Sequence, residues 1–158
     1  MPRFYYVFLF ALLIVANVNV YRMIFASRVL TVTVLEIGKG NAALIKTSTR
    51  KIILIDTGPD ASILRALGDA LPMWQRKIDA IILTSSAARS AGGLSSIQSR
   101  YHISKIIRIG DVAIPYGSLF TFDDSTIEIL APATFKISYG TSVFKISSST
   151  PAGVYTSD

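Results

Sequence analysis

The chain of 158 residues is long enough for one globular domain with a short appendage. Its apolar content of 51% against 16% charged residues excludes a disordered chain, since such chains are poor in apolar residues. The absence of cysteine excludes disulfides, thiolate metal sites and cysteine catalysis. Lysine and arginine outnumber aspartate and glutamate by 16 to 10. This surplus favours anionic partners such as lipid headgroups or nucleic acid, although a moderately basic surface without a dedicated partner fits equally well.

The amino terminus carries an apolar run that predicts a membrane-spanning helix. Residues 4–16 read FYYVFLFALLIVA, and the run extends past two asparagines to Tyr21. A helix over residues 4–21 would measure about 27 Å at roughly 1.5 Å per residue, close to the roughly 30 Å of a bilayer core. A cleaved signal peptide is the alternative, but no A-x-A cleavage pattern follows. We therefore predict a single-pass cell-membrane anchor over residues 1–28 and one domain over residues 29–158.

Beyond the anchor, strand patterns alternate with helix patterns. Alternating β-branched residues predict strands, and apolar residues spaced three and four apart predict amphipathic helices. The expected strands are 29–35, 42–47, 51–55, 78–83, 105–109, 118–122, 126–130, 142–146 and 153–156, and the expected helices are 62–71 and 94–101. Asp60 or Ser62 is expected to cap the first helix. This order predicts an α/β (α+β) domain with a mixed sheet and helices on one face.

Three segments together carry a resemblance to a known family. They are LEIGKGNAALIKT (residues 35–47), KIILIDTGPDASILRALGDALP (51–72) and IDAIILTSSAARSAGGL (78–94). In order and spacing they resemble the metallo-β-lactamase-like domain of the ComEC competence proteins of DNA uptake, which typically reads LDVGQGDA, ILIDGGP and LTHxDxDHxGGL. The resemblance implies an αββα sandwich, with two sheets between outer helices, on the extracytoplasmic side of the membrane.

The loop that holds the metal ions in this family lacks its ligands here. Imidazoles and carboxylates hold two metal ions that share one water or hydroxide in such sites. The matching positions are Ser85, Ala87, Arg89 and Ser90. The resemblance therefore predicts a pseudoenzyme without a cofactor, with a binding or assembly role. The alternative is a metal-dependent phosphodiesterase or nuclease, as the intact family implies.

The scaffold of this vestigial site is retained. Asp56 and Gly58 follow one strand, and Thr84, Gly92 and Gly93 frame the emptied loop. The resemblance gives Asp56 a supporting role behind the metal ligands, whereas the more ordinary interpretation is a loop or helix cap.

The carboxyl terminus bears on whether the sandwich is complete. Asp158 matches the metal-bridging aspartate of the family and is the last residue. The closing histidine, strands and helices of the family would lie beyond it. We therefore expect an incomplete sandwich that self-associates or pairs with a partner chain to complete its sheet. An unselected gene fragment is a further alternative.

Basic and aromatic residues gather after the second predicted helix. Arg100, Tyr101, Lys105 and Arg108 combine groups that contact phosphates and stack on bases. They are candidates for nucleic-acid contact, and a solvated helix end followed by a strand is the alternative. His102, the one histidine of the chain, is expected on the surface or in packing rather than as a metal ligand.

Overall fold

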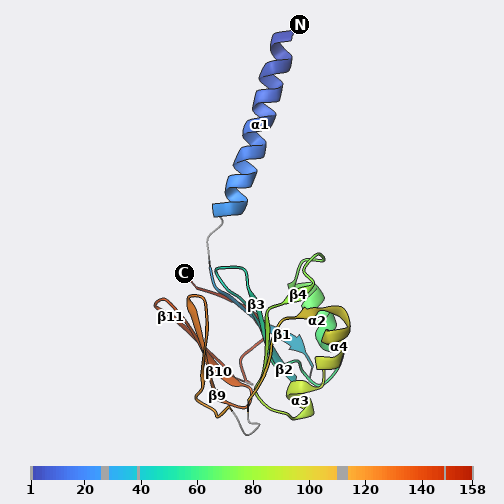
Figure 1. Cartoon of the computed structure of the whole chain (residues 1–158), viewed down its shortest axis with the longest axis vertical. Coiled ribbons are helices and arrows are strands. Elements are labelled where there is room, and N and C mark those ends of the chain that lie inside the picture. The colour runs from blue at the N-terminus through green and yellow to red at the C-terminus, as the bar shows by residue number, and fades with distance from the viewer. Residues whose placement is uncertain (1, 26–28, 39, 110–113, 148, 158) are drawn as a thin grey trace.

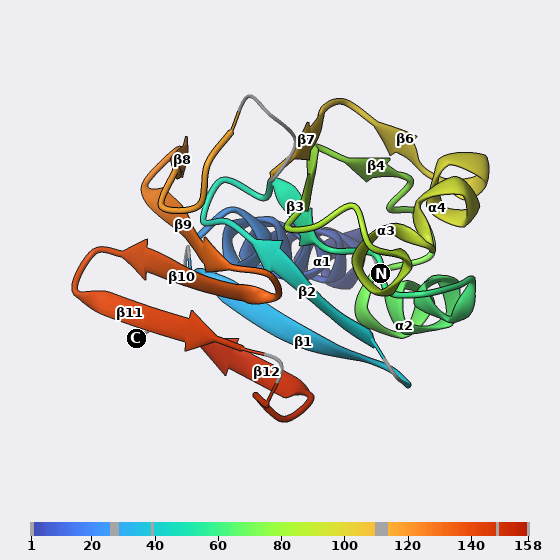
Figure 2. The same ribbon diagram turned by 90° about the horizontal axis from the view of Figure 1, so that it is seen from below.

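The computed structural model describes residues 2–25, 29–38, 40–109, 114–147 and 149–157. A long helix, α1 (Pro2–Phe25), stands apart from a globular part that begins with the first strand (Figure 1). The globular part is layered, with helices on one side, a larger sheet in the middle and a smaller sheet on the other side (Figure 2).

The larger sheet has six strands in the order β12-β1-β2-β3-β5-β7. They are β1 (Thr31–Ile37), β2 (Gly40–Lys46), β3 (Ile52–Ile55), β5 (Ala80–Leu83), β7 (Ile106–Arg108) and β12 (Gly153–Thr156). β3, β5 and β7 run parallel, and the other pairs are antiparallel. β3 and β5 are buried on both faces, which explains why their sequences are unbroken apolar runs.

The smaller sheet is an antiparallel meander in the order β11-β10-β9-β8. Its strands are β8 (Leu119–Phe122), β9 (Ser125–Ala131), β10 (Thr134–Tyr139) and β11 (Ser142–Ile146). Alternate residues of both sheets meet in one core, in which Ile53 and Ile82 of the larger sheet pack with Ile127, Phe135 and Ile137 of the smaller. This face-to-face packing buries one side of each sheet.

Three short helices cover the outer face of the larger sheet (Figure 2). They are α2 (Ser62–Ala70), α3 (Ala88–Ala91) and α4 (Leu94–Arg100). Ile63 and Leu67 of α2 and Ile97 of α4 are fully buried there. Two further short strands, β4 (Lys77–Ile78) and β6 (His102–Ile103), pair in parallel beside this layer.

Most of the predicted elements form, with several differences. The predicted strand 78–83 divides into β4 and β5, and the predicted loop 84–93 contains α3. β10 was not predicted, although its sequence TFKISY alternates as a half-buried strand should. The predicted side-chain cap of α2 is also wrong, because the cap position is Ala61. The carboxylate of Asp60 instead accepts a hydrogen bond from the Ser62 amide at 2.8 Å.

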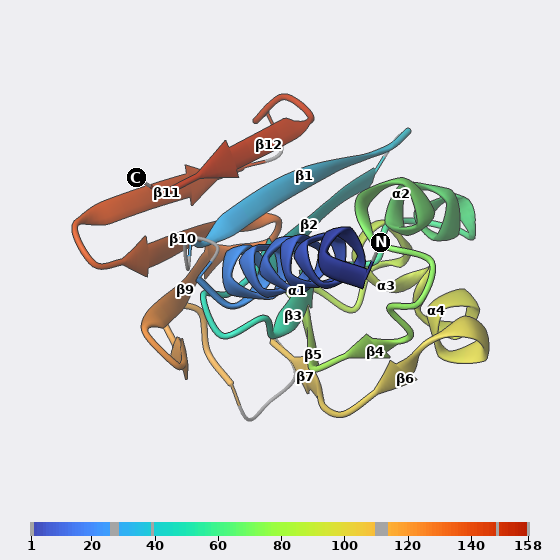
Figure 3. The ribbon, with the colours of Figure 1, turned by 90° about the horizontal axis from the view of Figure 1, so that it is seen from above.

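The membrane anchor and the outer helix layers differ from expectation. α1 forms where the span was predicted, and its apolar side chains at residues 4–18 are exposed. Figure 3 shows the ribbon of α1 in front of the globular part, seen from above. Among the described residues, however, no helix is long and apolar enough to cross a membrane, so the predicted span is not supported. The boundary predicted at residue 28 lies outside the described residues. Within the described part of the globular domain, helices cover the larger sheet only.

Candidate functional site

The vestigial site lies where β3 and β5 end side by side. Because the two strands are parallel, their carboxyl ends meet at one edge of the sheet, where α/β folds commonly bind ligands. Asp56 follows β3 and Thr84 follows β5, and the Asp56 amide donates a hydrogen bond to the Ile82 carbonyl at 2.8 Å. The fold therefore brings together two residues that are 28 positions apart in the sequence.

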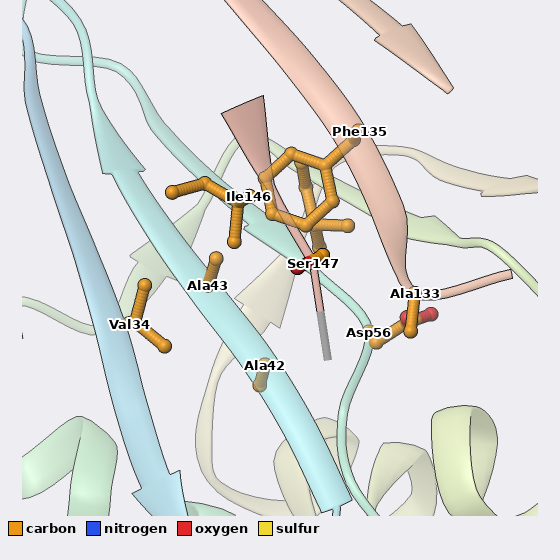
Figure 4. A pocket seen from close by; sticks show the side chains of 9 residues that line it. Val34, Ala42, Ala43, Asp56, Ala133, Phe135, Ile146 and Ser147 are labelled. Atoms are coloured by element: carbon orange, nitrogen blue, oxygen red, sulfur yellow. The ribbon is translucent and has the colours of Figure 1, made fainter. Parts of the chain in front are cut away.

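A hydrogen-bond network joins this edge to the smaller sheet. The amide and the hydroxyl of Thr84 donate to the two carboxylate oxygens of Asp56, at 2.7 Å and 2.6 Å. The Thr84 hydroxyl in turn accepts a hydrogen bond from the amide of Ala133, in the turn between β9 and β10, at 2.9 Å. Figure 4 shows Asp56 beside Ala133 at this end of the sandwich. The Tyr116 hydroxyl donates to the Thr84 carbonyl at 3.0 Å. Both oxygens of Asp56 are thus engaged within the protein.

Asp56 is an aspartate in an unusual environment. Its exposed fraction is only 2%, and burial raises the pKa of its carboxyl from 3.8 to about 6, against the opposing hydrogen bonds from Thr84 and Ser90. Its backbone has a φ of 56°, in the left-handed region that aspartate and asparagine adopt more readily than most residues. The carboxyl is therefore held in a strained, water-poor position by its neighbours.

The emptied loop packs directly on the loop after β3. The amide and hydroxyl of Thr57 both donate to the Ser90 carbonyl, at 2.7 Å and 3.1 Å. The Gly93 amide donates to the Gly58 carbonyl at 3.0 Å. These bonds satisfy backbone groups that would otherwise be buried without a partner.

The glycines of the vestigial site have a packing role. A Cβ at Gly93 would lie 2.7 Å from the Asp60 carbonyl oxygen, and one at Gly92 would lie 2.7 Å from that of Ala88. A Cβ at Gly58 would meet the side chain of Ile37, and the φ of 70° there also favours glycine. Close backbone approach therefore accounts for these glycines without any metal chemistry.

The residues at the ligand positions do not fit a pair of metal ions. The Ser85 hydroxyl accepts the Ala87 amide at 3.1 Å, and Ser90 is buried in the loop packing. Ala87 and Arg89 are exposed, and an arginine remains protonated and cannot bind a cation. Within the described ranges, no group of three or more acidic or histidine side chains could hold a metal ion. Asp158 lies outside the described residues.

The space beside Asp56 is small. A pocket lined by Val34, Ala43, Phe135 and Ile146 reaches the Asp56 carboxyl (Figure 4), with a cavity volume of about 10 Å³. That is about the volume needed for one water molecule.

The predicted nucleic-acid residues divide into two kinds. Arg100, Lys105 and Arg108 are exposed. Tyr101 is buried, with an exposed fraction of 6%, and the guanidinium of Arg76 lies 6.0 Å from the centre of its ring. Tyr101 therefore has a core position instead of the stacking position that the sequence suggested. His102 is exposed, as expected.

Tyr116 and Ala133 contact the vestigial site but were not predicted. They lie 32 and 49 positions from Thr84 in the sequence. Their contacts involve a tyrosine hydroxyl and a backbone amide in a turn, so no local pattern marks either residue. Only the packing of the two sheets brings them to the site.

The comparisons with known proteins concern the fold. No protein-family model and no curated protein matches the sequence. Solved structures match, among them a Cronobacter sakazakii metallo-β-lactamase with the HARLDQ motif, at 16% identity over 72% of this chain and 52% of that chain, with a TM-score of 0.50. A mutant of that protein matches at 17% identity over 68% of this chain and 56% of its own, with a TM-score of 0.51. The chain has a metallo-β-lactamase-like fold.

A third match is a diphosphatase of the PhnP family, at 15% identity over 72% of this chain and 64% of that chain, with a TM-score of 0.47. The chain spans about half the length of the first structures it matches. At these identities the likeness concerns the metallo-β-lactamase-like fold alone. The chemistry must be argued from the residues of this chain.

Proposed function

We propose that this protein is a non-catalytic binding or assembly domain with a metallo-β-lactamase-like fold, related to the corresponding domain of the ComEC competence proteins. The observation that carries the proposal is the set of side chains at the ligand positions, Ser85, Ala87, Arg89 and Ser90. Two hydroxyls, a methyl group and a guanidinium offer no imidazole or carboxylate to a metal ion. The buried carboxylate of this site, Asp56, already accepts hydrogen bonds on both oxygens.

The three segments that carry the family resemblance together form the end of the domain that contains the vestigial site. The first forms β1 and β2, the second forms β3 and the loop with Asp56, and the third forms β5 and the loop with α3. Their role here is mutual packing, because Gly92 and Gly93 fit directly against the loop after β3. This arrangement supports descent from a ComEC-like domain whose loop has lost its metal ligands and kept its packing against the loop after β3.

The metal content of the full-length protein tests the non-catalytic proposal. We expect protein purified without chelator to hold far less than one zinc or manganese ion per chain, and to hydrolyse bis(p-nitrophenyl) phosphate no faster than buffer with the same metal. A metal-binding enzyme of the same fold, handled in parallel, controls for metal lost in purification. Stoichiometric metal that survives dialysis, together with phosphodiester hydrolysis, would establish the alternative, a metal-dependent phosphodiesterase or nuclease.

The edge of the larger sheet supports an assembly role. β12 stands at one end of the strand order and pairs only with β1 among the described strands. Val154 in β12 has an exposed fraction of 65%. Edge strands with exposed apolar side chains invite pairing with another chain. We therefore propose that a partner strand, from a second copy or another protein, adds to β12.

Sedimentation tests the pairing at β12. We expect the full-length protein in mild detergent to self-associate at micromolar concentration, and Val154→Asp to weaken the association because charged side chains protect sheet edges. Leu119→Asp is the matched control, since Leu119 lies in β8 of the other sheet and is also 65% exposed. Equal effects of both substitutions, or a monomer throughout, would argue against β12 as the contact.

We further propose that α1 attaches the protein to a membrane, with the domain on the extracytoplasmic side. The support is the series of exposed apolar side chains at residues 4–18, among them Phe4, Phe8 and Leu12. Such a surface is unfavourable in water and favourable in lipid. Recovery of the protein in the membrane fraction after cell lysis, and its digestion by protease added to intact spheroplasts, are the expected results. Recovery of the protein in the soluble fraction would exclude the attachment.

A further inference from the structure

One turn carries the most exposed large apolar side chains of the described globular part. Met73 and Trp74 have exposed fractions of 85% and 83%. The Gln75 amide donates to the Pro72 carbonyl at 2.9 Å, so the two residues form the centre of an ordered four-residue turn. Glycine, proline, asparagine, aspartate and serine are the usual residues of turns. Two large apolar side chains at this position favour contact with something other than water.

The turn is held out from the domain by bonds at its base. The Gln75 side-chain amide donates to the Lys77 carbonyl at 2.6 Å, and the His102 amide donates to the Arg76 carbonyl at 2.7 Å. Lys77 and His102 are also partners in the pairing of β4 with β6. The tip formed by Met73 and Trp74 is therefore presented on a fixed base.

Cationic side chains surround the turn. Arg76, Lys77, Arg100 and Lys105 are all exposed. They belong to one area, because Arg76 lies over the ring of Tyr101, next in sequence to Arg100. The amide of Ser104, next to Lys105, also donates to the carbonyl of Ile78, next to Lys77, at 3.0 Å. Two carboxylates of this area oppose them. One is Asp79, whose Oδ1 lies 2.8 Å from the Lys77 ammonium, and the other is Asp69 in the last turn of α2. A net positive charge remains.

This area lies at the end of the domain where the chain arrives from α1. Thr31, the first residue of β1, is paired with Lys46, and the Lys46 ammonium donates to the Ala70 carbonyl at the end of α2, at 2.9 Å. The turn at residues 72–75 begins just beyond Ala70. Figure 1 shows the loop between α2 and β4 at the same end as the chain from α1. Asp56 lies at the opposite end of β3.

We propose that this surface, formed by Met73, Trp74, Arg76, Lys77, Arg100 and Lys105, docks on an anionic lipid bilayer. Trp74 and Met73 enter the interfacial layer, where tryptophan is favoured, and the cations face the headgroup phosphates. The inference rests on the proposed membrane attachment through α1 and adds a second contact. It turns the vestigial site away from the membrane.

Lipid fits the surface better than nucleic acid does. The carboxyl end of α1 lies at this same end of the domain (Figure 1), so one bilayer can contact both α1 and the turn. Single-stranded nucleic acid is bound on several exposed aromatic rings in succession. Here the neighbouring Tyr101 is buried and Met73 offers no ring.

Trp74 is the one tryptophan of the chain, so its fluorescence reports on the turn directly. The full-length protein is diluted from mild detergent onto vesicles of phosphatidylcholine, with or without phosphatidylglycerol, and binding is measured by co-sedimentation. We expect Trp74 emission to shift to shorter wavelength and to be quenched by brominated lipid, more strongly on the anionic vesicles. A single-stranded oligonucleotide is expected to leave the emission unchanged.

Charge variants test the role of the cations. Arg100→Gln with Lys105→Gln should lower the extent of quenching on anionic vesicles several-fold, since each cation near such a surface contributes about 1 kcal/mol, roughly a fivefold change. Arg89→Gln with Lys145→Gln is the matched control, because it removes the same charge at exposed positions near the other end of the domain. Quenching in the control should equal that of the unchanged protein.

Three results would overturn the proposal. Protein that co-sediments while Trp74 keeps the emission of a water-exposed indole would refute the docking and leave the attachment through α1 standing. Protein that fails to co-sediment with either vesicle would refute both. Quenching by the oligonucleotide in place of lipid would assign the surface to nucleic acid.

Discussion

The two ends of the larger sheet differ in how their loops are packed. At the carboxyl ends of β3 and β5, polar groups and glycines of the two loops pack directly against one another. At the amino ends, an ordered turn presents Met73 and Trp74 with more than four fifths of their surface exposed. The end where such folds commonly bind ligands is closed by the chain itself, and the other end is open. The glycines and Asp56 at the closed end therefore have a role in close packing, whatever chemistry the site performs.

The largest effect should come from adding a methyl group at the closed end. Gly93→Ala places a Cβ 2.7 Å from the Asp60 carbonyl oxygen and also against Ile63, so backbone must shift. We expect the free energy of unfolding to fall by about 3 kcal/mol. Chemical denaturation followed by circular dichroism measures it.

Gly68→Ala is the control for that substitution. Gly68 lies within α2, and a Cβ there meets no atom within 4 Å. The change should stabilise the helix by up to about 1 kcal/mol, the helix preference of alanine over glycine. Similar behaviour of the two variants would mean that the loops are not closely packed, and the contrast between the ends would be lost.

A comparably large effect should appear with pH at Asp56. Its pKa is about 6 in the folded protein against an ordinary 3.8, so the folded state binds the proton more tightly than the unfolded chain. Stability should therefore rise as the pH falls from about 7 through about 6 towards about 4, and should be lost again as the pH rises through about 6. A shift of this size corresponds to about 3 kcal/mol.

Asp56→Asn separates this effect from other titrations. The amide oxygen can accept the Thr84 amide and the NH₂ can donate to the Thr84 hydroxyl, so asparagine imitates the protonated carboxyl and tolerates the positive φ. The variant should be more stable than the unchanged protein near pH 7, and the difference should vanish near pH 4. Parallel stability curves for the two proteins would show that Asp56 is not the titrating group.

The smallest effect on stability should come from the open end. Trp74→Ser removes a side chain that is 83% exposed, and we expect the free energy of unfolding to change by less than about 0.5 kcal/mol. The same variant should bind anionic vesicles less well. A loss of stability as large as that of Gly93→Ala would mean that Trp74 serves the fold, and the proposed contrast between the two ends would fail.

Most of the fold could be predicted from local patterns. The apolar runs of β3 and β5 and the helical spacing of Ile63 and Leu67 in α2 are strong local signals, and each element forms within a residue or two of its predicted bounds. α3 has only four residues and no such signal, so the loop that contains it was predicted as irregular. β10 does alternate, and its omission was an error of interpretation.

The candidate site was predicted only in part. The positions of Asp56, Thr84 and the glycines followed from the resemblance, and the structure places them at adjoining strand ends. Tyr101 was misjudged, because an aromatic residue next to arginines suits both a stacking surface and a core, and only its burial decides between them. The sequence shows that Met73 and Trp74 are an apolar pair beside Arg76 and Lys77, but it does not show that their side chains are exposed.

By itself, the sequence determined which residue types are available at the vestigial site, since Ser85, Ala87, Arg89 and Ser90 include no imidazole or carboxylate. It also indicated most of the strands, because alternation and apolar runs are local properties. The tertiary structure alone decided that Ala133 and Tyr116 reach Thr84, that Asp56 loses its water and gains a pKa of about 6, and that Trp74 stands in solvent. The contacts to Thr84, the pKa of Asp56 and the exposure of Trp74 all depend on how segments far apart in the chain pack together. Local sequence carries no signal for such packing.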